Sequence, residues 1–266
     1  MTQPEFSRKR MCLLVWAFAL PFVAAAALIA ALWFWTDSDT SLASALSQAT
    51  RYLPAGQSLT VEGVHGSLRR GGHIEMLRWK YGTWTIEARQ INLAWQPLAL
   101  LDRRLQLESL RVSQLTIEGT GTSSAHTPLD QLLLPFQVDV KFMVDALRWT
   151  GPPVLDAQQL AGRYQFDHQR HSLNLTSAQV ASGQYNAQAT LLARAPLSLE
   201  GKLQGKLETS VPGGNRAWPL DATVSIKGDL AGLEGLLDVQ AELHPSAPAA
   251  ESMRAKVSAQ VKPWVA

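Results

Sequence analysis

From Leu59 onward, apolar and polar residues of this chain alternate with a period of two. The clearest stretch is residues 138–144, in which Val138, Val140, Phe142 and Val144 are separated by Asp139, Lys141 and Met143. Because successive side chains of a strand point to opposite faces, this period predicts strands with one apolar and one polar face. Short segments rich in Gly and Pro separate the stretches, which predicts a long antiparallel meander.

The apolar face of this predicted sheet consists largely of small residues, with Ala or Gly at many of its positions. No second layer is predicted to cover it, so we expect the sheet to curl into an open apolar groove. A two-sheet sandwich that covers its own apolar face is the alternative. The candidate groove-lining residues are Val138, Val140, Phe142, Val144, Tyr185, Leu191, Leu197, Leu199, Leu203, Leu207, Val224, Ile226, Val257 and Val261.

Residues 11–35 contain no charged side chain. A helix of that length spans a hydrocarbon core of about 30 Å, which predicts a transmembrane helix. Arg8, Lys9 and Arg10 precede the segment, so residues 1–10 are expected to form a basic cytoplasmic tail with the remainder across the membrane. A cleaved signal peptide is the alternative, but the apolar segment exceeds the usual ~7–15 residues.

Residues 36–53 are expected to contain a short amphipathic helix that follows the membrane span. Leu42, Ala45, Leu46, Ala49 and Leu53 recur at helical spacing before a proline. Residues 54–266 then form the repetitive β-groove domain. The predicted class is therefore all-β with one N-terminal transmembrane helix and a short helix after it.

The charges and motifs exclude several classes of function. The region after residue 35 carries as many basic as acidic residues, which argues against a nucleic-acid partner. Cys12 is the only cysteine, and no nucleophile elbow, phosphate-binding loop or zinc-protease motif occurs. His168 and His171 are the only neighbouring histidines, and a turn-like loop explains them better than a metal pair does. We expect no enzyme activity, no cofactor and no metal.

Two arginine pairs, Arg69-Arg70 and Arg103-Arg104, lie beside predicted turns. Solvated turn residues explain them best, and contact with lipid headgroups is the alternative.

The ordered motifs of residues 51–118 carry a resemblance. A Leu53-Pro54 pair precedes a Val61–Leu68 turn, a strand ending in Trp79, the stretch 91–97 and a Leu100–Leu105 segment. This order resembles the N-terminal end of the TamB family, the AsmA-like inner-membrane subunits of the translocation and assembly module. The motif-bearing part covers about a quarter of the chain, and the later repeats match only in kind.

The resemblance implies a β-taco whose groove conducts phospholipid acyl chains between the inner and outer membranes. It also implies outer-membrane protein and autotransporter assembly with a TamA-type barrel, through a C-terminal part that is not present here. The implied location is the bacterial inner membrane, with a single pass and the bulk in the periplasm. The natural chain is expected to continue past Ala266. A scaffold like the type II secretion N component, which conducts no lipid, is the alternative.

Overall fold

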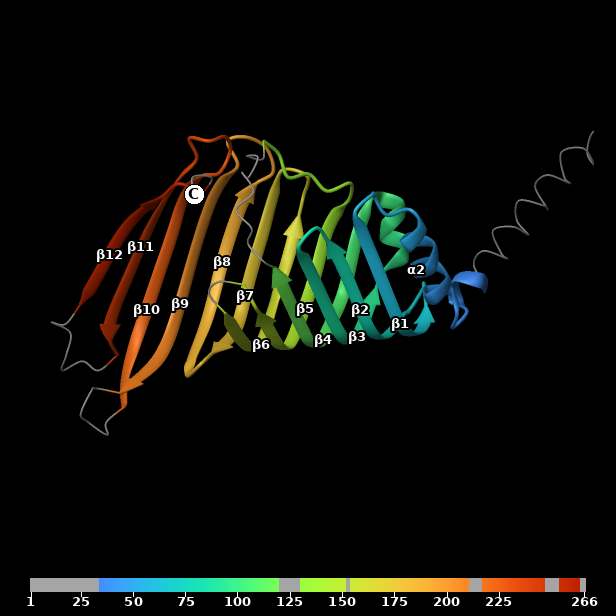
Figure 1. Ribbon diagram of the computed structural model, residues 1–266, viewed down its shortest axis with the longest axis horizontal. Coiled ribbons are helices and arrows are strands. Elements are labelled where there is room, and N and C mark those ends of the chain that lie inside the picture. The colour runs from blue at the N-terminus through green and yellow to red at the C-terminus, as the bar shows by residue number, and fades with distance from the viewer. Residues whose placement is uncertain (1–33, 120–129, 152–153, 211–216, 247–253, 264–266) are drawn as a thin grey trace, which may run out of the picture.

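The described residues form one sheet of twelve strands whose order in space is their order in the chain (Figure 1). The computed structural model describes residues 34–119, 130–151, 154–210, 217–246 and 254–263. The strands are β1 (Gln57–Ser67), β2 (Gly71–Tyr81), β3 (Trp84–Trp95), β4 (Arg104–Gly119), β5 (Gln137–Trp149), β6 (Leu155–Phe166), β7 (Arg170–Val180), β8 (Gly183–Leu192), β9 (Ser198–Ser210), β10 (Ala217–Asp229), β11 (Leu236–Pro245) and β12 (Ala255–Val261). The alternation therefore predicted the β class and the uncrossed strand order correctly.

The prediction of an antiparallel sheet is wrong at one place. Strands β4 and β5 pair in parallel, whereas every other neighbouring pair of strands in the described residues is antiparallel. A parallel neighbour requires a connection of about a dozen residues or more, long enough to run back along the preceding strand. Residues 120–136 supply such a connection, and a hairpin turn could not.

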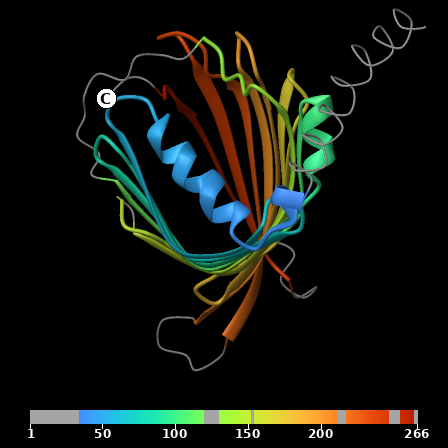
Figure 2. The ribbon, with the colours of Figure 1, turned by 90° about the vertical axis from the view of Figure 1, so that its right-hand side faces the viewer.

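A short helix follows residue 36, as predicted. Helix α2 (Ser41–Arg51) lies inside the concave side of the curled sheet at its N-terminal end (Figure 2). Leu42 is buried, and Leu46 packs against the main cluster of buried side chains. The apolar face is therefore the concave face, and α2 covers one end of it.

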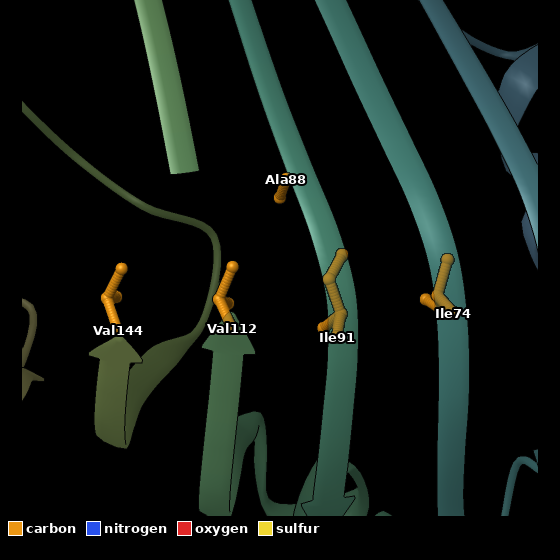
Figure 3. Packing of buried hydrophobic residues seen from close by; sticks show 5 residues of the cluster. All are labelled: Ile74, Ala88, Ile91, Val112 and Val144. Carbon is orange, nitrogen blue, oxygen red and sulfur yellow. The ribbon is translucent and has the colours of Figure 1, made fainter. Parts of the chain in front are cut away.

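The main buried cluster lies beside α2. Ile74, Ile91, Val112 and Val144 occupy paired positions on β2, β3, β4 and β5 and project from the same face, with Ala88 nearby (Figure 3). Burial of these β-branched side chains is the chief favourable contribution to folding at this end of the sheet. The core of the protein thus occupies the N-terminal half of the concave face.

The segment before α2 is fastened to the turn between β1 and β2. The backbone N–H of Arg69 donates to Thr36 O at 3.1 Å, and that of Gly66 donates to Asp39 O at 3.2 Å. The hydroxyl of Ser41, fully buried, donates to Ser38 O at 2.7 Å and accepts from the Leu68 N–H at 2.9 Å.

Replacing Ser41 by alanine should lower the free energy of unfolding by about 1–3 kcal/mol, because the Leu68 N–H loses its acceptor in a buried site. Thermal and urea denaturation measure the change. Ser44→Ala on the exposed side of α2 is the control, with an expected change within about 0.5 kcal/mol. Equal losses in the two variants would contradict the anchoring role of Ser41.

The predicted membrane span is not tested by the structure. Residues 11–33 lie outside the described residues, and 34–37 form a single helical turn. Among the described residues, the structure contains no helix with both the length and the apolar character needed to cross a membrane.

Candidate functional site

The candidate lining residues of β5 share one face, as the alternation predicted. Val138, Val140 and Val144 pair with Leu105, Leu107 and Val112 of β4. Paired residues of neighbouring strands lie on the same face of a sheet, so the register extends this face from strand to strand.

Two apolar rows cross most of the sheet in this way. We call the first the central row; it runs from β3 to β12 through Leu93, Leu110, Phe142, Gly162, Leu175, Ala187, Leu203, Val224, Ala241 and Val257. The second row runs beside it from β4 to β12 through Leu107, Val140, Tyr164, Leu173, Ala189, Gly201, Ile226, Val239 and Ala259. Every member of both rows is apolar, glycine or tyrosine.

None of these side chains is fully buried. Members of both rows are half-buried on β4 to β11, apart from Leu173 on β7, which is more exposed, and Val257 and Ala259 on β12 are exposed. Among the described residues, the helix on this face is α2 at the N-terminal end, and the segment at residues 130–136 bonds to His171, Ala193 and Ala195 at the ends of β7 and β8. The C-terminal half of the sheet therefore presents a continuous apolar surface without a second layer.

Larger side chains of neighbouring strands lie over the glycines of this face. A methyl group added at Gly205 would lie 2.3 Å from the Tyr185 ring, and one at Gly201 would lie 2.7 Å from Ile226 Cγ2. Phe142 lies over Gly162 in the same way. Large side chains thus fill the space above neighbouring glycines, and the apolar surface has few deep depressions.

The remaining candidates also lie on strands, with one exception. Leu191 and Leu199 pair across β8 and β9, Leu207 pairs with Leu220, and Val261 pairs with Leu237. Leu197, by contrast, is not in a strand: it lies in the turn before β9 with φ 54° and is buried. Its alternation with Leu199 does not place it on the strand, because β9 begins only at Ser198.

Residues of the two rows on β3, β4, β6, β7 and β11 were missed by sequence reasoning. β-bulges explain part of this: Leu175 and Ala178 of β7 lie three residues apart, yet each pairs with an apolar-face residue of β8. Alternation of Leu173 with Leu175, and of Leu105 with Leu107, was the signal that could have found the others.

His171 is a structural residue. Its Nδ1 lies 2.7 Å from Tyr164 Oη and its Nε2 lies 2.8 Å from Leu132 O, so both ring nitrogens have hydrogen-bond partners. The ring stacks on Phe166 at 4.4 Å between centroids, whereas His168 is exposed in a turn. No group of metal-ligating residues occurs among the residues that the structure describes.

The opposite face is polar, and several of its charged side chains form ion pairs. Lys227 and Glu200 lie opposite each other at 2.9 Å, as do Lys256 and Glu242. Two hollows of about 650 and 870 Å³ on this face are lined mainly by amide, hydroxyl and charged side chains. These solvated groups offer no acid–base pair held in a catalytic arrangement.

One of these pairs is bidentate and joins Arg163 to both carboxylate oxygens of Asp139. Arg163 Nε donates to Asp139 Oδ1 at 2.7 Å, and this hydrogen bond holds the pKa of the Asp139 carboxyl below its usual 3.8. A folded-state pKa below the unfolded value stabilises the protein above that unfolded value. The contribution is lost as the pH falls through the folded-state pKa.

Arg163→Gln should raise the pKa of Asp139 toward its usual value. A carbon-13 NMR titration of the carboxyl group measures it. The stability lost near neutral pH should be at most about 1 kcal/mol, because the pair is partly exposed. Arg148→Gln, which removes a different pair on the same face, is the control and should leave Asp139 unchanged. An unchanged Asp139 titration in the first variant would contradict the pairing.

The candidate site is therefore the concave apolar face formed by the central and second rows. It has the chemistry to hold hydrocarbon and carries no catalytic constellation in the described residues. No protein-family model, curated protein or solved structure matches this chain. The resemblance to the TamB family accordingly stays a prediction from residues 51–118.

Proposed function

We propose that the concave apolar face holds phospholipid acyl chains and lets them pass along the sheet. The observation that carries this proposal is the central row, which continues across ten strands without a fully buried member. Exposed apolar surface of this extent is typical of a binding surface. Removing an acyl chain from a bilayer costs about 0.8 kcal/mol per methylene unless another apolar surface receives it.

The dimensions suit such a ligand. Strands of 10–13 residues on β5 to β11 correspond to roughly 33–43 Å, and twelve strands extend for roughly 55 Å across the sheet. An apolar surface with few deep depressions favours movement of an acyl chain along it over tight binding at one position. Transfer along it needs no catalytic residue.

In this proposal residues 11–35 anchor the protein in the bacterial inner membrane and place the sheet in the periplasm. Lipid then moves between the inner and outer membranes, in support of outer-membrane protein assembly with a TamA-type barrel. The resemblance of residues 51–118 to the TamB family supports this location and role.

A scaffold without lipid transport, like the type II secretion N component, is the second candidate. The observation in its favour is that Leu46 of α2 packs against the buried cluster around Ile74, so that part of the concave face is occupied by the protein itself. If ligand never occupies the rest of the face, the sheet serves as a structural element only.

Site-specific photocrosslinking of the full chain in Gram-negative cells separates the two candidates. A benzophenone amino acid at Leu203 on the central row should form adducts with phospholipid, detected by mass spectrometry. The matched control is the adjacent Gln204, which points to the polar face of the same strand. Adducts at Leu203 but not at Gln204 support lipid binding. No lipid adduct at Leu203, or equal labelling at both positions, would leave the scaffold as the better account.

A further inference from the structure

The short helix η1 (Pro97–Asp102) exposes apolar side chains although its backbone is fixed. Leu98 is 60% exposed and Leu101 is 82% exposed. The Arg103 N–H caps the helix by donating to Leu100 O at 3.0 Å, and Arg103 O accepts from the Gln137 N–H at 2.9 Å. The two leucines are therefore held outward by the fold.

A second pair of exposed apolar side chains lies at the same rim of the sheet. Phe34 is 76% exposed, and Trp35 is also exposed. The chain after them is hydrogen-bonded to the β1–β2 turn through Thr36, and β2, which follows that turn, pairs at its first residues with Leu93 near the end of β3. Since η1 begins just after β3, η1 and the segment at residues 34–36 lie near the same end of β3, at one corner of the sheet.

The sequence indicates which environment surrounds this corner of the molecule. Residues 11–33 contain no charged side chain, and this apolar run leads directly into Phe34 and Trp35. A segment of that character is soluble in hydrocarbon, so a lipid surface reaches this corner if the segment is inserted. Arg103 and Arg104 follow η1 and are exposed, with Asp102 as the one acidic neighbour in that stretch. Exposed aromatic, leucine and arginine side chains together are typical of segments at a membrane interface.

We propose that Phe34, Trp35, Leu98, Leu101, Arg103 and Arg104 form a docking collar that inserts its apolar side chains into a phospholipid bilayer. Phe34 and Trp35 are the last residues of the predicted span, and η1 with Arg103 and Arg104 adds a second membrane contact beside them. It sets one rim of the sheet against the bilayer surface and so fixes the orientation of the concave face relative to the lipid. This inference rests on the proposed membrane anchoring of residues 11–35.

Depth-dependent fluorescence quenching of the full chain tests the collar. The protein carries Cys12→Ser and Leu101→Cys, so that an environment-sensitive dye labels position 101. It is reconstituted in phosphatidylethanolamine–phosphatidylglycerol vesicles that contain doxyl-labelled lipid as the quencher. The matched control is Tyr52→Cys, because Tyr52 is 84% exposed and lies at the same end of the sheet on the opposite rim. We expect strong quenching at position 101 and little at position 52. Adding Leu98→Asp to the labelled protein should reduce the quenching at 101.

Each other outcome overturns the collar. Equal quenching at both positions would mean that the bilayer covers that end without using this rim. No quenching at 101 in a chain that resists carbonate extraction would remove the collar and leave the proposed lipid-binding function untouched. A chain that carbonate releases from the vesicles, with no quenching, would remove both the collar and the anchoring on which it rests.

Discussion

Replacing Ile226 by aspartate should strip phospholipid from the concave face while the protein stays folded. Ile226 lies in the second row on β10, with its Cγ2 methyl over Gly201. A carboxylate there requires water, and burying it unpaired beneath an acyl chain is strongly unfavourable. Displacing about three methylenes to hydrate it would cost roughly 2.4 kcal/mol, or about a 50-fold loss in lipid affinity.

The stability of this variant should change little, because Ile226 is only half-buried and the new carboxylate can reach solvent. Mass spectrometry of extracted lipid gives the phospholipid content per protein, and the thermal midpoint Tm gives the stability. Ser225→Asp places the same charge on the polar face of the same strand and should leave the lipid content unchanged. Normal lipid content in Ile226→Asp, with an unchanged Tm, would mean that this face does not hold lipid.

Replacing Phe166 by alanine should produce the largest loss of stability, about 3–5 kcal/mol. Phe166 is 2% exposed and stacks on His171, whose Nε2 bonds Leu132 O in the connection between β4 and β5. Removing the ring leaves a cavity and loosens the imidazole that fastens this connection.

For a domain of this size, that loss corresponds to a fall in Tm of about 6–20 °C. Phe136→Ala is the matched control, because Phe136 belongs to the same connection but is 40% exposed. Its effect should be about 1 kcal/mol or less. Similar shifts in the two variants would show that the cluster around Phe166 does not hold the connection in place.

The sequence predicted the strands and their apolar face because period-two alternation is a local property of the backbone. Val138 to Val144 demonstrate this, since the extra residue of the irregularity opposite them lies in β4 and leaves the alternation of β5 intact. The helix at α2 was predictable for the same reason, from the spacing of Leu42 and Leu46.

Other features depend on contacts between distant residues and leave no local pattern. The parallel pairing of β4 with β5 depends on where residues 120–136 lead the chain. The bulge in β7 shifts Ala178 onto the apolar face, against the alternation. His171 was assigned to a solvated loop because nothing near it in the sequence indicates Leu132, 39 residues away, as its partner.

The uncrossed order of the strands also determines how this protein loses its structure. Each strand makes its extensive contacts only with the strands beside it, as in repeat proteins whose stability is a sum of nearest-neighbour interfaces. Within the described residues the two ends of this array differ: β1 is supported by α2, whereas β12 pairs with β11 alone and is exposed on both faces. Local opening should therefore begin at β12 and proceed inward, while the strands around Ile74 open last.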